Sequence, residues 1–255
     1  MTAHTARILI IAGSDSGGGA GIQADIKTVT MLGGHAMTAI TAITAQNTLE
    51  VRDVLALPVA LVEAQFRAVV DDIGVDAVKI GMLGRADLAN AVHDLLLTLP
   101  RDVPVVFDPV MIATSGGVLA EKGTTEAMQR LLPLATVVTP NLPELETLGG
   151  EAAVAAKASA VLVKGGHAEG DPIIDRLVSQ DGEVARWSGS RIHTTSTHGT
   201  GCTLASAIAT GLGQGMTLEA AIDRARRFVR AALLAAPELG RGHGPMGHQA
   251  VRDLD

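Results

Sequence analysis

Residues 197–203 read Thr-His-Gly-Thr-Gly-Cys-Thr, and they lie where an irregular polar loop gives way to a predicted helix of small residues at about 202–212. Glycine lets the backbone approach a ligand closely, and a helix start leaves backbone N–H groups without partners. Cys202, the only cysteine, falls on the first helical turn, which stabilises negative charge and is expected to lower the pKa of the thiol. The alternative is a plain turn followed by a small buried cysteine. The candidate anion-binding loop consists of Gly199, Thr200 and Gly201.

Outside this loop, short runs of β-branched residues alternate with longer helical patterns, which is typical of parallel strands joined by crossover helices. With 255 residues and no linker or repeat, we expect a single α/β domain over residues 1–255. Strands are predicted at residues 7–12, 36–43, 54–57, 76–80, 103–107, 136–139 and 160–163, followed by a hairpin at 173–178 and 184–187. Helices are predicted at residues 22–32, 59–73, 87–97, 121–132, 143–148, 202–212 and 218–236.

Polar and glycine residues cluster just after the predicted strands. In open α/β sheets, ligands bind outside the carboxyl ends of the strands, so residues far apart in sequence can share one cleft. One edge of the sheet is therefore predicted to carry the functional site. The residues at these strand ends are Ser14, Asp15, Gln46, Asn47, Gly81, Met82, Asp108, Asn141, Glu144 and Lys164.

The composition argues against several classes of protein. The net charge is −7 and aromatic residues make up 2% of the chain, whereas nucleic-acid surfaces usually need a basic stripe or stacking platforms, so we expect no nucleic-acid partner. No apolar run approaches the roughly 18 residues of a membrane helix, and no secretory segment is evident, so we expect no membrane association and a cytoplasmic location. A single cysteine excludes an intrachain disulfide and a cysteine-based zinc site.

Two familiar nucleotide-binding patterns fit this chain poorly. Residues 19–24 satisfy the loose dinucleotide fingerprint, but no acidic residue occurs at 38–46, where the next strand closes. A phosphate loop is also missing, because the sequence contains no Gly-Lys-Ser or Gly-Lys-Thr. If a nucleotide binds, the loop at 199–201 is the better candidate, and the glycine-rich residues 13–21 are expected to line a small-molecule pocket.

Several motifs follow one another across almost the whole chain. They are residues 12–25 (Ala-Gly-Ser-Asp-Ser-Gly-Gly-Gly-Ala-Gly-Ile-Gln-Ala-Asp), 44–48 (Thr-Ala-Gln-Asn-Thr), 79–83 (Lys-Ile-Gly-Met-Leu), 108–111 (Asp-Pro-Val-Met), 139–144 (Thr-Pro-Asn-Leu-Pro-Glu), 164–167 (Lys-Gly-Gly-His), 197–203 and 242–245 (Gly-His-Gly-Pro). Each is a weak signal alone, but their order is specific. Together they resemble the ribokinase-like superfamily and, within it, the hydroxymethylpyrimidine/phosphomethylpyrimidine kinases of thiamine biosynthesis.

This resemblance implies a three-layer α/β/α fold with a mostly parallel central sheet, an ATP- and Mg²⁺-dependent kinase, and a homodimer. The implied substrate is a small molecule, 4-amino-5-hydroxymethyl-2-methylpyrimidine, which is phosphorylated to the monophosphate and then to the diphosphate. A pyridoxal kinase of the same superfamily is an alternative, since some of these enzymes also carry cysteine after the glycine loop. A non-catalytic vitamin-binding protein is a third possibility, which the presence of Asp108, Glu144, Lys164 and Cys202 disfavours.

The resemblance places phosphoryl transfer at the loop of residues 199–201, whose backbone donors would face the transferred phosphate, with Lys164 supplying positive charge. Cys202 stands where most of the superfamily has an aspartate base. A thiolate there could accept the hydroxymethyl proton, but a pKa near the ordinary value of about 8.5 would leave little base at neutral pH. Cys202 is therefore expected at the reaction centre, where positioning supplies most of the effect.

Oxygen-bearing side chains at two strand ends are the expected Mg²⁺ ligands, namely Asp108 and Glu144, because Mg²⁺ favours oxygen and usually keeps several waters. Asn141 could cap the helix that begins near Pro143, or bind the nucleotide, or do both. The residues expected to bind ATP are Thr139, Asn141, Lys164, Gly199 and Gly201.

The acceptor ring is expected to bind beside Gln46, because a primary amide offers a donor and an acceptor that can pair with the amino group and ring nitrogen of an aminopyrimidine. Met82 and Val110 would supply apolar walls, although a core role for Met82 is nearly as plausible. The family also places Asp25 and the first glycine-rich loop, including Gly13, near the substrate.

Overall fold

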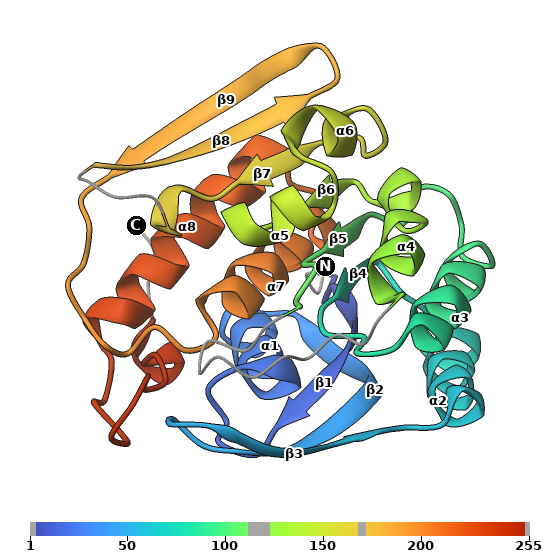
Figure 1. Ribbon diagram of the computed structural model, residues 1–255, viewed down its shortest axis with the longest axis horizontal. Coiled ribbons are helices and arrows are strands. Elements are labelled where there is room, and N and C mark those ends of the chain that lie inside the picture. The colour runs from blue at the N-terminus through green and yellow to red at the C-terminus, as the bar shows by residue number, and fades with distance from the viewer. Residues whose placement is uncertain (1–3, 112–122, 168–171, 253–255) are drawn as a thin grey trace.

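The computed structural model describes residues 4–111, 123–167 and 172–252. Within these residues, nine strands form one sheet in the order β3-β2-β1-β4-β5-β6-β7-β8-β9 (Figure 1). The strands are β1 (Arg7–Asp15), β2 (His35–Gln46), β3 (Val51–Ala56), β4 (Ala77–Ile80), β5 (Val105–Phe107), β6 (Val137–Val138), β7 (Val161–Val163), β8 (Ile173–Ser179) and β9 (Gly182–Gly189). The α-helices are α1 (Gly21–Met31), α2 (Val59–Asp72), α3 (Ala86–Leu96), α4 (Thr124–Gln129), α5 (Leu142–Thr147), α6 (Glu151–Ala155), α7 (Thr200–Gly213) and α8 (Leu218–Leu234).

The central strands are parallel and the outer strands are antiparallel. β1 pairs in parallel with β2 on one side and β4 on the other, and the parallel pairing continues through β7. β3 runs antiparallel to β2, and β8 and β9 form the predicted hairpin next to β7. The expected α/β class with a mostly parallel sheet is confirmed.

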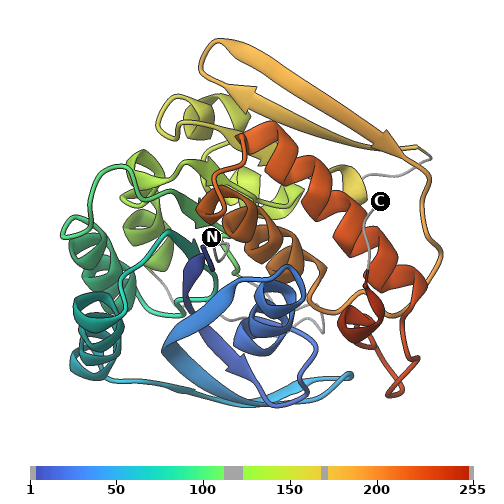
Figure 2. The ribbon, with the colours of Figure 1, turned by 180° about the vertical axis from the view of Figure 1, so that it is seen from behind.

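Helices cover both faces of this sheet. Successive side chains of a strand point to opposite faces, so Leu9 and Ile11 of β1 join the core against α2, α3 and α4. Ile8 and Ile10 join the second core, against α1, α7 and α8. Figures 1 and 2 show these two groups of helices with the sheet between them, which is the expected three-layer α/β/α arrangement.

The element boundaries differ from the prediction in a few places. β2 continues beyond the predicted end at Ile43, because its antiparallel pairing with β3 extends as far as Gln46 opposite Val51. α4 begins at Thr124, and the first two residues of the predicted helix, 121 and 122, lie outside the described residues. α6 has only five residues, too few to show a helical period in the sequence.

The order of strands explains where a ligand can bind. The chain leaves β1 for β2 on one side and later returns to β4 on the other side of β1. The crevice above this reversal, at the carboxyl ends of the strands, is where open α/β sheets bind ligands. In this chain it is also where the polar strand ends converge.

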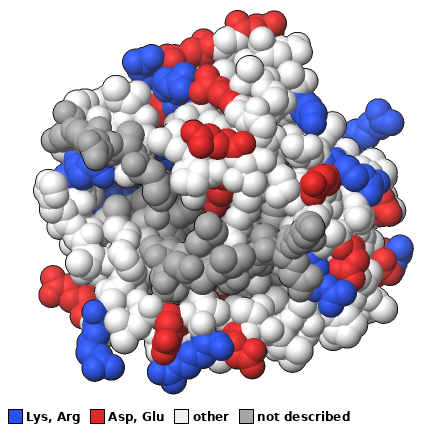
Figure 3. Space-filling model, viewed as in Figure 1, with Lys and Arg blue, Asp and Glu red and all other residues white. Residues whose placement is uncertain are grey.

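Figure 3 shows blue Lys and Arg side chains interspersed with red Asp and Glu side chains on one face of the molecule. No helix in the described part of the chain has the length and apolar character needed to cross a bilayer.

Candidate active site

One cavity of about 1150 Å³ lies at the carboxyl ends of the parallel strands and the start of α7. Segments from both halves of the chain line it, so the strand ends meet in one cleft, as their sequence positions predicted. The predicted site residues that line it are Gly13, Gln46, Met82, Asp108, Val110, Asn141, Glu144, Lys164, Gly199, Thr200, Gly201 and Cys202. Asp25 and Thr139 do not line it.

The start of α7 faces this cavity without a side-chain cap. Its N-cap residue, Gly199, has a φ of 83°, and an added Cβ there would run into the backbone of Gly19, so glycine is required at this position. A Cβ added to Gly201 would lie 3.4 Å from Asp108 Oδ2 and 3.4 Å from Lys164 Nζ. The backbone of the first turn thus closely approaches a carboxylate and an ammonium, and all three line the cavity. Free N–H groups at a helix start favour an anionic ligand on this side of the cavity.

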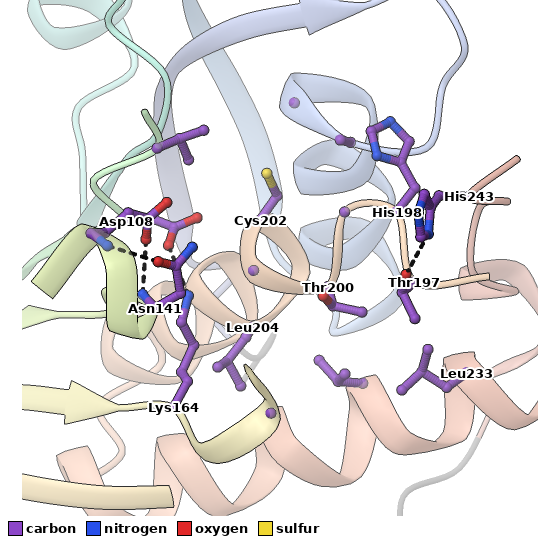
Figure 4. A pocket seen from close by; sticks show the side chains of 18 of the residues that line it. Asp108, Asn141, Lys164, Thr197, His198, Thr200, Cys202, Leu204, Leu233 and His243 are labelled. Carbon is purple, nitrogen blue, oxygen red and sulfur yellow. Dashed lines mark hydrogen bonds and ion pairs between the residues drawn. The ribbon is translucent and has the colours of Figure 1, made fainter. Parts of the chain in front are cut away.

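Cys202 lies between two groups of polar side chains. Figure 4 shows Asp108, Asn141 and Lys164 on one side of it and His198 on the other. Burial raises the pKa of the Cys202 thiol to about 12, with Lys79 opposing the shift. A helix start contributes only about 0.3 to 1 kcal/mol, less than one pKa unit, so the expected lowering of this pKa is wrong. Cys202 is a neutral thiol at neutral pH.

Asp108 follows β5 and is almost completely buried. Its Oδ1 accepts a hydrogen bond from Thr139 Oγ1 at 3.0 Å and from Lys164 Nζ at 3.3 Å. Thr139, expected to bind nucleotide, instead lies behind Asp108, and its hydroxyl holds that carboxylate in place. The second oxygen, Oδ2, is the one that faces Gly201.

Asn141 is the N-cap of α5, so the capping role considered for it is confirmed. Its side chain accepts a hydrogen bond from the Glu144 N–H at 2.9 Å, and Glu144 Oε2 accepts one from the Asn141 N–H at 2.8 Å. Burial, together with repulsion by Asp108, raises the pKa of Glu144 to about 7 from an ordinary value of 4.5. Glu144 therefore exchanges a proton near neutral pH, within reach of the cavity.

Asp25 lies under the reaction centre, where it has no exposed surface. Its Oδ2 accepts a hydrogen bond from Lys79 Nζ at 2.8 Å, and its Oδ1 accepts one from Ser206 Oγ at 2.7 Å. Burial alone would lower the pKa of Lys79, but the charge of Asp25 raises that pKa above its ordinary value. The resemblance placed Asp25 near the substrate, but Asp25 does not line the cavity. It is the counter-ion of Lys79, a buried lysine that does line the cavity.

Asp15 organises the first glycine-rich loop. Its carboxylate accepts hydrogen bonds from the N–H groups of Gly17, Gly19 and Ala20, at 2.8, 3.0 and 2.8 Å. His198 Nε2 lies 2.9 Å from Asp15 Oδ2, which ties this loop to the loop before α7. Burial by itself would raise the pKa of Asp15, but the hydrogen bonds from His198 and the loop lower it, so Asp15 is ionised.

The expected acceptor pocket lies at the other end of the cavity. The Gln46 amide is 3.2 Å from His198 Nε2 and 3.2 Å from Thr44 Oγ1. Met82 and Val110 provide apolar lining, and a Cβ at Gly13 would lie 3.2 Å from Met82 Sδ. Met82 thus packs directly against the backbone of Gly13, and a side chain at position 13 would displace it.

Lys79, His198 and Asp15 have polar contacts at the site but were not predicted as site residues, and neither were the lining residues Arg226, Arg230 and Leu233 of α8. Lys79 could have been noticed as a charged residue within a buried strand pattern, because buried lysines need a partner. His198 and Asp15 were predicted only as a loop residue and a strand-end residue. Their contact joins positions 183 residues apart, which no local pattern reveals.

Comparison with known proteins gives one family. The family model for phosphomethylpyrimidine kinase matches residues 15–247. The hydroxymethylpyrimidine/phosphomethylpyrimidine kinase of Streptomyces coelicolor is 46% identical over 94% of this chain and 93% of its own length. The enzyme of the same name from Haemophilus influenzae is 43% identical over 97% and 98%. The bifunctional thiamine biosynthesis protein ThiED of Geobacter sulfurreducens is 48% identical, and the match covers 54% of that longer protein.

Solved structures of pyridoxal kinases and of a phosphomethylpyrimidine kinase share this fold. The ADP complex of Bacillus subtilis pyridoxal kinase superposes with a TM-score of 0.88 at 32% identity, covering 98% of this chain and 99% of that one. Phosphomethylpyrimidine kinase from Clostridium difficile superposes with a TM-score of 0.75 at 36% identity, covering 89% and 98%. The matched family model, the sequence relatives and the shared fold together establish that the chain belongs to the phosphomethylpyrimidine kinase family.

Proposed function

We propose that this chain transfers a phosphate from Mg-ATP to the hydroxymethyl group of 4-amino-5-hydroxymethyl-2-methylpyrimidine, and then a second phosphate to the resulting monophosphate. The observation that carries the proposal is the approach of Gly201, at the start of α7, to Asp108 and Lys164, with Cys202 as the next residue. The curated names of the Streptomyces and Haemophilus relatives support it. We infer one kinase domain over residues 1–255, since the described strands share one sheet. From the composition we also infer a cytoplasmic enzyme without a membrane or nucleic-acid partner.

The phosphates of ATP would bind between α7 and Lys164. Free N–H groups at a helix start favour anions, and the helix adds a partial positive charge. Lys164 brings an ammonium close to this helix start, 3.3 Å from Asp108. Bound ADP in the Bacillus subtilis pyridoxal kinase supports a nucleotide in this fold.

Asp108 and Glu144 would hold Mg²⁺ together with phosphate oxygens and water. No group of three or more ligating side chains occurs among the described residues, which suits an ion that is bound through one or two carboxylates and the substrate. The ion would neutralise charge on the phosphates. Because Asp108 Oδ1 is already engaged by Thr139 and Lys164, its Oδ2 is the oxygen available for the metal.

The acceptor ring would lie against the apolar side chains of Met82 and Val110, with its polar edge on Gln46 and its hydroxymethyl group toward Cys202. A neutral thiol cannot serve as an efficient base at neutral pH, since very few molecules carry the thiolate when its pKa lies far above the pH. Cys202 would therefore orient the hydroxyl group, and most of the rate would come from aligned phosphates and positive charge.

We also infer that the protein is a homodimer. Ile43 of β2 and Leu55 of β3 are cross-strand neighbours, and they are 48% and 64% exposed. Exposed apolar pairs on an edge ribbon favour association with another copy. The interface would be the outer surface of β2 and β3.

Pyridoxal is the second candidate substrate, because the Bacillus subtilis pyridoxal kinase shares this fold with a TM-score of 0.88. The decisive experiment is a side-by-side assay of purified protein with Mg-ATP and each substrate, measuring ADP release and identifying products by chromatography. We expect kcat/KM for the hydroxymethylpyrimidine to exceed that for pyridoxal by at least about 10-fold, a difference that one well-placed hydrogen-bonding pair can supply. Faster turnover of pyridoxal would reverse the assignment.

A further inference from the structure

The side-chain amide of Gln46 lies between two polar partners. One end is 3.2 Å from Thr44 Oγ1, and the other end is 3.2 Å from His198 Nε2. In the structure the amide oxygen faces Thr44 and the nitrogen faces His198. Half a turn about the last side-chain bond exchanges the two atoms in nearly the same space, so the chemistry of the partners decides which order is stable.

The Thr44 end requires a donor from Gln46. Thr44 Oγ1 has a single hydrogen, and two acceptors lie within its reach: the backbone carbonyl oxygen of Ser14 at 2.9 Å and the Gln46 amide oxygen at 3.2 Å. The closer Ser14 oxygen takes this hydrogen, and the lone pairs of Oγ1 remain for Gln46. An amide NH₂ suits those lone pairs, whereas an amide oxygen would face another acceptor.

The His198 end requires an acceptor from Gln46. His198 Nε2 lies 2.9 Å from Asp15 Oδ2, and an ionised carboxylate can only accept, so Nε2 carries the hydrogen. An Nε2 that carries this hydrogen has no lone pair to accept from an amide NH₂, whereas an amide oxygen can share the hydrogen with Asp15. The ring is held in place, since His198 is 5% exposed and an added Cβ at Gly19 would lie 2.5 Å from its Cδ2.

Both ends thus require the same order, and we propose that His198 and Thr44 lock the Gln46 amide with its oxygen toward His198 and its nitrogen toward Thr44. His198 is a positioning residue for specificity in this arrangement. Each end of the amide then has one hydrogen-bonding position left, an acceptor and a donor in a set order. This inference rests on the proposed contact between Gln46 and the acceptor ring.

The locked order selects among pyrimidines. An aminopyrimidine presents an amino donor next to a ring-nitrogen acceptor, which matches the free oxygen and N–H of Gln46. The 4-oxo analogue presents a carbonyl acceptor next to a ring N–H donor, the reverse order. A Gln46 that is free to turn would serve both rings, whereas a locked Gln46 leaves polar groups of the 4-oxo ring unpaired.

The test compares kcat/KM for the 4-amino substrate with kcat/KM for its 4-oxo analogue in purified variants, each checked by its thermal unfolding curve. We expect the ratio to fall at least about 10-fold in His198→Phe and in the isosteric Thr44→Val, because Gln46 can then turn. Thr44→Ser keeps the hydroxyl and should retain the wild-type ratio. His35→Phe, at the exposed opposite end of β2, is the matched histidine control and should also retain it.

Three results would count against the inference. An unchanged ratio in both His198→Phe and Thr44→Val would show that neither residue orients the amide. A Thr44→Ser variant that behaves like Thr44→Val would remove the hydroxyl from the argument. Gln46→Ala tests the contact between Gln46 and the ring separately from the orientation of the amide. A loss of discrimination in this variant supports ring recognition by Gln46. An unchanged ratio overturns both that contact and the proposed orientation of the amide by His198 and Thr44.

Discussion

Cys202 is the residue whose environment differs most from its expected one. The sequence places it at a helix start, but burial raises the pKa of its thiol to about 12. Because the thiol is neutral, we expect Cys202 to orient the acceptor by a hydrogen bond, which the hydroxyl of a serine at this position could also make. A role as a thiolate base would require substrate binding to change that environment.

For Cys202→Ala we expect kcat to fall about 100-fold with little change in KM for the pyrimidine, because a reacting hydroxyl that is no longer held in position can lose about that much rate. Cys202→Ser should retain most of the activity, because its hydroxyl can still orient the acceptor. Steady-state kinetics of both variants at pH 7.5 provide the measurement. An equally severe loss in the serine variant would favour a thiolate instead.

Glu144 predicts a pH dependence of Mg²⁺ binding. Its pKa is raised to about 7, so below that pH the carboxyl is mainly protonated and must lose its proton to bind the ion. The Mg²⁺ concentration for half-maximal activity at saturating ATP should therefore rise as the pH falls from 8 to 6. Glu144→Gln, which carries no titrating group, should need more Mg²⁺ throughout and lose most of this pH dependence. A wild-type midpoint that stays constant between pH 6 and 8 would rule out Glu144 as the titrating ligand.

Elements α1, β4 and α7 are joined beneath the site by the buried carboxylate of Asp25. Asp25 of α1 pairs with Lys79 of β4, and Ser206 of α7 donates to the same carboxylate. Neither side chain of the ion pair has exposed surface. Such a pair fixes the relative positions of three elements, including the helix whose start faces the cavity.

Removing one partner of this pair should be strongly destabilising. Asp25→Ala leaves the Lys79 ammonium buried without its counter-ion, which should cost about 3 to 5 kcal/mol of unfolding free energy. The double variant Asp25→Leu with Lys79→Met removes both charges and should recover much of that loss. Urea unfolding followed by circular dichroism measures both. A double variant no more stable than Asp25→Ala would contradict the role of the unpaired charge.

The outer surface of β2 and β3 gives a prediction for the molecule as an assembly. If two copies meet there, Leu55→Lys introduces a charge into the interface and should convert the dimer to a monomer of 26.1 kDa. Val184→Lys is the matched control, since Val184 is 53% exposed on β9 at the opposite edge of the sheet. Light scattering during gel filtration distinguishes the two masses. A dimer that persists in Leu55→Lys would exclude this interface.

Much of the fold was predictable, because most of the parallel strands are short runs of apolar and β-branched residues and the longer helices show apolar residues at helical spacing. The family model and the curated relatives confirm the expected kinase of thiamine biosynthesis. The short α6 and the extension of β2 were missed, since five residues show no period and strand length depends on the pairing with β3. Most of the predicted strand-end residues line the cavity, but Asn47 and Gly81 are not among its lining residues.

The chain by itself determined the order of elements and the glycine-cysteine start of α7, because periodicity and backbone freedom are local properties. Only the tertiary structure decided that the Cys202 thiol is neutral, that Asp25 and Thr139 do not line the cavity, and which residues contact Gln46. These depend on burial and on contacts between residues distant in sequence, such as Asp15 with His198. Burial and long-range hydrogen bonds belong to the folded chain, so no local stretch of sequence reveals them.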